Sequence, residues 1–181
     1  MKSSEKQNLR NELRQRIRDA GPLCSDGVVR KIADHLNADG TIQTIAVYAA
    51  LPGEVSLAGL GSLLGQKDCV KWVFPKVVGE RLKFFQIRDP DIDMERGAFG
   101  IMEPKDGLEE VGIAQIDVFL CPGLGFDTRG GRVGRGKGFY DRMLSGARPD
   151  AIKLGVCFTF QLVDQVVMEP HDIRMDHVIS G

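Results

Sequence analysis

The residues best suited to chemistry lie in one stretch, "GRVGRGKGFYDR" (131–142), which combines four glycines with four basic residues. Glycine lets backbone N–H groups approach a ligand closely and permits positive φ. Arginine and lysine add positive charge, and arginine suits bidentate contacts with phosphate. A helix is expected to begin near Phe139, so its positive end would point at the same place. We therefore predict a phosphate-binding loop, with Asp141 able to hold a cation.

Two known phosphate-binding motifs do not fit this stretch. From Gly131 it reads G-x-x-x-x-G-K, but Gly138 follows where a P-loop has the Ser or Thr that binds magnesium. The spacing of the later glycines is G-x-G-x-G, whereas the dinucleotide fingerprint is G-x-G-x-x-G. The alternative is a solvated turn in which glycine serves geometry and the charges serve solubility. The convergence of glycines, cations and a helix start favours phosphate binding.

Composition predicts an ordinary globular protein, with one domain over residues 1–181. Hydrophobic residues make up 43% and charged residues 27% of the chain, and its net charge is −1. No global basic field would attract nucleic acid or an anionic membrane. Apolar runs are too short for a membrane helix, and charges occupy the N-terminal segment where a secretory signal is apolar. The four separated cysteines indicate neither a zinc site nor disulfides, which fits a reducing cytoplasm.

The hydrophobic period alternates along the chain between helical and strand-like values. In residues 6–18, Leu9, Leu13 and Ile17 form one apolar stripe, and Ser25 is a candidate N-cap for the next helix. Pro75 is expected to stop the strand predicted at residues 69–74. The predicted helices are 6–18, 26–37, 56–65, 139–146 and a short one near 161–168; the predicted strands are 42–51, 69–74, 81–87, 116–121, 152–158 and one near 176–180, with a polar loop after residue 87.

This alternation predicts an α/β fold with three layers, in which helices cover both faces of a mostly parallel sheet. Ligands of such sheets bind beyond the carboxyl ends of the strands. Three Gly- or Pro-containing turns follow strands, "LPGEV" (51–55), "FPKV" (74–77) and "CPGLGFD" (121–127). We expect these turns to share one cleft.

The segment "CPGLGFDTRGGRVGRGKGFYDRML" resembles the signature of the 5-formyltetrahydrofolate cyclo-ligase family. Other blocks resemble the family in the same order: "KQNLR" (6–10), "LPGEV", "FPKV", "GIMEP" (100–104) and "EPHDIRMD" (169–176). These blocks span nearly the whole chain. Many members have "GYGGGYYD" where this chain has "GRGKGFYD", and the Arg/Lys version is also a recognised form. Phe139 lacks the usual hydroxyl, so stacking or core packing is expected there and a hydrogen bond is not.

The resemblance implies a single α/β domain like those of sugar-phosphate isomerases and CoA transferases. It also implies conversion of 5-formyltetrahydrofolate to 5,10-methenyltetrahydrofolate. This reaction would consume ATP, require magnesium, and release ADP and phosphate. The partners implied are these small molecules, with no nucleic acid and no membrane, and the chain is expected to act as a monomer.

The resemblance also assigns roles to individual residues. Lys6 and Arg10 would contact ATP, and Asp141 and Asp172 would hold magnesium. Glu54 would hydrogen-bond the folate, with Ala49 nearby. Residues 132–140 would wrap the phosphates, and the part from Arg135 to Phe139 would also touch the folate; the loop residues concerned are Arg132, Val133, Gly134, Arg135, Gly136, Lys137, Gly138, Phe139 and Tyr140. Arg135 and Lys137 are the expected catalytic cations.

Other interpretations stay open for several residues. Without the resemblance, Lys6 and Arg10 would be read as cations on the solvent face of a helix, and Glu54 as an exposed turn carboxylate. Lys76 could reach phosphate or only help to end its turn. We read His171, Asp176 and His177 as structural or supporting, because magnesium prefers oxygen ligands. Two other functions remain: a catalytically silent folate- or nucleotide-binding paralogue, and a sugar-phosphate isomerase-like enzyme that needs no ATP.

Overall fold

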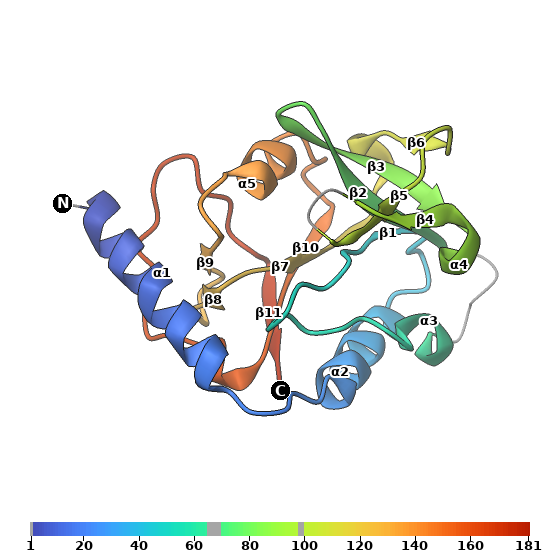
Figure 1. Cartoon of the computed structure of the whole chain (residues 1–181). Helices are drawn as coiled ribbons and strands as arrows, with labels where there is room; N and C mark the ends of the chain where they lie inside the picture. Colours follow the sequence, from blue (N-terminus) through green and yellow to red (C-terminus); the bar gives the residue numbers. More distant parts are fainter. Residues whose placement is uncertain (1, 65–69, 98–99) are drawn as a thin grey trace.

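A computed structural model describes residues 2–64, 70–97 and 100–181, and its centre is a seven-stranded sheet (Figure 1). The strand order is β11-β10-β7-β1-β2-β3-β6. Pairing is parallel from β11 to β2, and β3 and β6 are antiparallel additions at one edge. The strands are β1 (Thr44–Ala46), β2 (Lys71–Val78), β3 (Arg81–Ile87), β6 (Glu110–Val111), β7 (Val118–Pro122), β10 (Ile152–Cys157) and β11 (His177–Ser180). The prediction of a mostly parallel sheet is confirmed.

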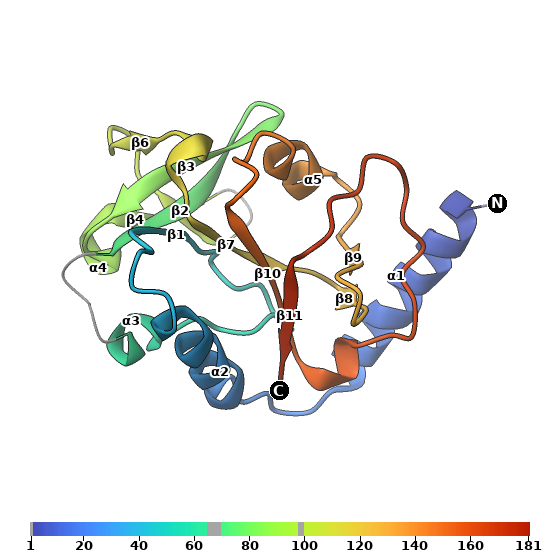
Figure 2. The same ribbon diagram turned by 180° about the vertical axis from the view of Figure 1, so that it is seen from behind.

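Helices cover both faces of this sheet, as the alternating pattern predicted (Figures 1 and 2). On one face α2 (Asp26–Asn37) and α3 (Leu60–Leu63) pack over β1, β7 and β10. On the other face α5 (Phe139–Leu144) buries Met143 and Leu144 against Phe119. Alternate residues of the central strands therefore enter two separate cores, which is why these strands are apolar throughout.

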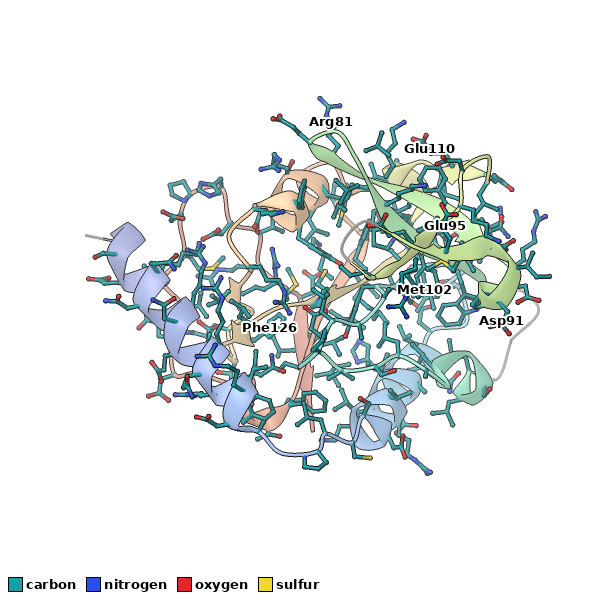
Figure 3. The ribbon with its side chains drawn as sticks, viewed as in Figure 1. Arg81, Asp91, Glu95, Met102, Glu110 and Phe126 are labelled. Atoms are coloured by element: carbon teal, nitrogen blue, oxygen red, sulfur yellow. The ribbon has the colours of Figure 1, made fainter. Side chains whose placement is uncertain are left out.

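The first helix, α1 (Lys2–Asp19), lies apart from the sheet against a small hairpin (Figure 1). The hairpin consists of β8 (Gly125–Phe126) and β9 (Arg132–Val133). Leu13 is fully buried and packs with Leu124 and Val133, and Leu9 and Ile17 flank it, so the predicted stripe is confirmed. Phe126, labelled in Figure 3, is fully buried between the hairpin and the sheet. No described helix is long and apolar enough to span a membrane.

Several boundary predictions were wrong. Pro75 does not stop β2, which continues to Val78 because β3 pairs with it on one side while β1 reaches only as far as Val73. A strand that has lost one neighbour tolerates proline. Ser25 precedes α2 but makes no side-chain cap, since its hydroxyl accepts a hydrogen bond from Ser56 N–H instead. β1 and α3 are shorter than predicted, and residues 65–69 lie outside the described part of the chain.

Two predicted segments have a different structure. The helix expected near 161–168 is only a 3₁₀ turn, η2 (Thr159–Gln161), followed by a chain without helix up to β11. The polar loop after residue 87 contains α4 (Pro90–Asp93) and the hairpin of β4 (Met94–Arg96) and β5 (Met102–Pro104); a second 3₁₀ turn, η1 (Ile113–Gln115), precedes β7. Long-range packing, not local periodicity, decides both segments.

Candidate active site

A cavity of about 540 Å³ opens beyond the carboxyl ends of β1 and β7. These neighbouring strands mark the point where the chain changes its direction of advance across the sheet, the usual ligand position in such folds. Leu51 and Glu54, Pro75 and Val77, and Pro122 and Gly123 line it, so the three predicted turns do share one cleft.

Most of the predicted site residues line this one cavity. They are Lys6, Arg10, Ala49, Glu54, Arg132, Gly134, Arg135, Gly136, Lys137, Gly138, Phe139, Tyr140, Asp141 and Asp172. Val133 is the exception: its side chain is fully buried in the core beneath α1, and its carbonyl accepts a hydrogen bond from Leu124 N–H.

The glycine-rich loop is braced from α1. Arg10 Nε donates to the carbonyl of Gly134 at 3.2 Å, and Arg14 Nη2 to the carbonyl of Arg135 at 3.4 Å. Gly136 and Gly138 have φ values of 105° and 65°, which side chains rarely allow. Because the carbonyls are held toward α1, this turn geometry is maintained beside the cavity. Arg14 had not been predicted, although it follows Lys6 and Arg10 at four-residue spacing.

Three cations of the cavity are each paired with a carboxylate. Lys6 Nζ lies 3.2 Å from Glu169 Oε2 and 2.5 Å from Asp172 Oδ2. Arg132 Nη2 donates to both oxygens of Asp141, at 3.1 and 3.0 Å, and its guanidinium lies over the Tyr140 ring. The pairing of Lys6 contradicts the reading of this residue as a cation on a solvent face, since only 5% of its side chain is exposed.

The third pair joins the loop to the turn after β1. Arg135 donates to Glu54 Oε1 from Nε at 3.1 Å and from Nη2 at 2.9 Å. The other carboxylate oxygen of Glu54 accepts the backbone N–H of Leu51 at 3.0 Å. The Glu54 side chain is only 6% exposed, so its reading as an exposed turn carboxylate was wrong. Glu54, predicted to bind the folate, is therefore in direct contact with Arg135 of the predicted phosphate-binding loop.

The segments that carry the two predicted metal ligands are in contact. Asp141 Oδ1 accepts the backbone N–H of Ile173 at 3.2 Å, next to Asp172 in the chain. Burial would raise the pKa of Asp172, but hydrogen bonds from Lys6 and from Glu169 N–H outweigh it and hold the pKa below its usual value. Asp172, Glu169 and His171 also offer ligand atoms within 4.8 Å of one another. Carboxylate oxygens are the donors that Mg²⁺ prefers, so Asp172 and Glu169 are suitable ligands for that ion, whereas Asp141 does not belong to this group of three.

The chain was compared with known protein families and solved structures. The 5-formyltetrahydrofolate cyclo-ligase family matches residues 2–181. The chain belongs to this family. A curated 5-formyltetrahydrofolate cyclo-ligase of Mycoplasma pneumoniae is 30% identical over 151 residues, which cover 83% of this chain and 80% of the relative. That of Haemophilus influenzae is 27% identical over the full length of both chains.

Solved structures agree with this membership. The NMR structure of Aquifex aeolicus 5,10-methenyltetrahydrofolate synthetase superimposes with a TM-score of 0.78 at 30% identity, covering 97% of this chain and 89% of that one. A 5,10-methenyltetrahydrofolate synthetase of Mycoplasma pneumoniae gives a TM-score of 0.77 at 26% identity. The α/β architecture is therefore one already seen in cyclo-ligase relatives.

The cavity also has an apolar wall that sequence reasoning missed. Val77, Leu82, Ile101 and Met102 come from β2, β3 and the segment ending in β5 (Figure 3 labels Met102). Tyr48 completes the wall, and its hydroxyl donates to the carbonyl of Val55 at 2.9 Å. Burial raises the pKa of Tyr48 well above its usual value, so it stays neutral. The lining of the cavity therefore includes apolar side chains as well as the basic loop.

Two buried polar residues outside the cavity hold its backbone in place. Asp127 accepts N–H groups of Arg129, Gly131 and Val166 at 2.8–2.9 Å, which fixes the hairpin that carries Arg132. Gln161 donates from Nε2 to the carbonyls of Gly123 and Leu124, at 3.0 and 3.2 Å. Asp127 is the last residue of the predicted turn 121–127, so its place in the sequence could have marked it as important. No feature of the sequence marked Gln161.

Lys76, Asp176 and His177, which the sequence analysis also considered, do not line the cavity. Lys76 binds Asp106 at 2.6 Å, Asp176 binds Lys153, and the His177 ring packs against His35. These contacts agree with structural roles for Asp176 and His177. His171 lines the cavity, with Nε2 3.7 Å from Glu169. Cys121 and Cys157 are buried thiols, Cys24 is exposed, and Cys69 lies outside the described residues.

Proposed function

We propose that this protein converts 5-formyltetrahydrofolate to 5,10-methenyltetrahydrofolate, using ATP with magnesium and releasing ADP and phosphate. The observation that carries the proposal is the Arg135–Glu54 pair. It joins a cationic, glycine-rich loop suited to phosphates directly to a buried carboxylate beside an apolar wall. A phosphoryl donor and a pterin bound in this one cavity would be in contact.

The predicted roles follow this division of the cavity. Lys6, Arg10 and loop residues 132–140 would hold ATP, and Val133 would contribute backbone atoms alone, since its side chain is in the core. Glu54 and Ala49 would meet the folate, because a carboxylate suits the donor edge of a pterin. Arg135 and Lys137 would be the catalytic cations. Asp141 and Asp172 would hold magnesium, which when bound neutralises charge on the phosphates.

The reaction needs positioning more than protein nucleophiles. The formyl oxygen on N5 attacks the γ-phosphorus of ATP, a P–O bond forms, and the bond to the leaving ADP oxygen breaks. N10 then attacks the formyl carbon, loses its proton, and phosphate leaves with the former formyl oxygen as the ring closes. Each step moves negative charge among phosphate oxygens, where fixed cations and N–H donors lower the barrier. The loop supplies both kinds of group.

One assay tests this proposal. Mixing protein, magnesium-ATP and 5-formyltetrahydrofolate should produce the absorbance of methenyltetrahydrofolate, and omission of ATP or addition of excess EDTA should abolish it. Full turnover without nucleotide or metal would contradict the assignment. Binding of both substrates without turnover would instead indicate the silent paralogue. Turnover of a sugar phosphate would indicate the isomerase-like alternative, which the sugar-phosphate isomerase/CoA-transferase-like fold proposed here also allows. We expect a monomer with one domain, working in the cytoplasm.

A further inference from the structure

The ammonium of Lys6 lies buried between two carboxylates of the segment before β11. Its Nζ is 3.2 Å from Glu169 Oε2 and 2.5 Å from Asp172 Oδ2, and Asp172 Oδ2 also accepts Glu169 N–H at 2.6 Å. The side chains of Lys6 and Asp172 are only 5% and 6% exposed. Among the described residues, these two carboxylates are the ones within ion-pair distance of Lys6. The ammonium therefore neutralises a proposed magnesium ligand.

The other proposed magnesium ligand is neutralised in the same way. Arg132, with 4% of its side chain exposed, binds both oxygens of Asp141. Three carboxylates, those of Asp141, Glu169 and Asp172, thus face two buried cations, and the ring of His171 lies 3.7 Å from Glu169 and 3.9 Å from Asp172. A divalent ion that arrived alone at Asp172 and Asp141 would lie beside the buried ammonium of Lys6 and the buried guanidinium of Arg132, and like charges this close repel each other.

Nucleotide removes this obstacle. Lys6 lines the same cavity as the glycine-rich loop, so phosphate oxygens bound there would offer the ammonium a new partner. Lysine has a flexible stem and a compact charge, so it can change partners more easily than the arginine, which is held by its stacking on Tyr140 and by both Asp141 oxygens.

We propose that Lys6 is an internal counterion that keeps free divalent metal out of the site until nucleotide enters. When nucleotide binds, Lys6 moves from Asp172 to phosphate, and the metal takes the vacated carboxylate. This inference rests on the proposed function, because it takes Asp172 as a metal ligand and Lys6 as a phosphate contact. It predicts that loss of the ammonium changes metal binding and nucleotide binding in opposite directions.

The test measures Mn²⁺ binding without nucleotide, by electron paramagnetic resonance, and binding of a non-hydrolysable ATP analogue with saturating Mg²⁺. Lys6→Met keeps most of the buried stem and removes the charge. It should bind free Mn²⁺ about tenfold or more tightly than wild type, and the ATP analogue about tenfold or more weakly. Mn²⁺ alone should raise the melting temperature of Lys6→Met more than that of wild type. Lys6→Arg should keep the weak metal binding, because its charge remains.

Lys31→Met is the matched control, since this lysine is exposed on α2 and contacts the carbonyl of Ser180. It should behave as wild type in both titrations. Unchanged or weaker Mn²⁺ binding by folded Lys6→Met would overturn the proposal. If Lys6→Met does not fold, Mn²⁺ binding to wild type is compared with and without the ATP analogue. Equally tight Mn²⁺ binding in both conditions overturns the proposal, and much weaker binding without the analogue supports it. If one of these two overturning results is found while wild type turns over normally, only this inference is wrong. If wild type neither binds nucleotide nor turns over, the proposed function is wrong.

Discussion

Arg135 and Lys137 are the proposed catalytic cations of the glycine-rich loop, and both line the cavity. We expect Arg135→Ala and Lys137→Met each to lower kcat/KM, because each removes a cation from the position where phosphate charge develops. Loss of one such group typically costs about 2–4 kcal/mol in the transition state. Steady-state kinetics with varied ATP measure the effect. Turnover like that of wild type in both folded variants would reduce residues 131–142 to a structural turn.

Glu54 belongs to the folate half of the cavity. Glu54→Gln should raise the apparent constant for the folate far more than that for ATP, because it weakens acceptance of the pterin donors, while the amide oxygen that remains can still accept from Arg135. Glu110→Gln is a matched control, since Glu110 pairs with Lys83 at 2.8 Å on β6, away from the cavity. Equal effects of Glu54→Gln on both substrates would remove Glu54 from the folate site.

At the scale of elements, the β8–β9 hairpin depends on Asp127. Burial would raise the pKa of its carboxyl, but three backbone N–H groups and Arg129 outweigh burial and lower it. A lowered folded-state pKa adds stability above the unfolded pKa of about 3.9, and this stability is lost as pH falls through the folded pKa. Asp127→Asn should therefore cost about 1–3 kcal/mol of unfolding free energy at neutral pH, and less below about pH 4.

Urea unfolding at both pH values measures this difference. Asp34→Asn, a change of the same kind at an exposed position of α2, should stay near the stability of wild type. A cost for Asp127→Asn that does not shrink in acid would show that the carboxylate charge is not what holds the hairpin.

At the scale of the whole molecule, α5 places the carboxylate of Asp141 on the backbone N–H of Ile173, the residue next to Asp172. Asp141→Asn and Asp172→Asn should each raise the magnesium concentration needed for the half-maximal rate, and the double variant should lose less than the sum of the singles, because both act on one ion. Asp172→Asn should also lower the melting temperature without ligand, because it leaves Lys6 buried without its closer partner. Unchanged magnesium dependence in either single variant removes that residue from the site.

The sequence by itself determined the features that depend on local spacing. Leu9, Leu13 and Ile17 recur at helical intervals and predicted α1, and strand-like runs ending in turns predicted a cleft beyond a parallel sheet. The glycine-rich loop was recognisable because glycine and charge are needed there by the local backbone and its ligand. These patterns are carried by residues near one another in the chain, so no tertiary information was needed.

Only the tertiary structure decided which charges meet. Lys6 and Asp172 are separated by 166 positions, and Arg135 and Glu54 by 81. Their pairing depends on strand order and on where α1 packs, which no local period encodes. The same cause explains the errors: Pro75 lies within β2 because β3 pairs with it, and the segment after Gln161 is irregular and not helical because contacts with α1 and Asp127 hold it. Burial and long-range contacts override local propensity at such positions.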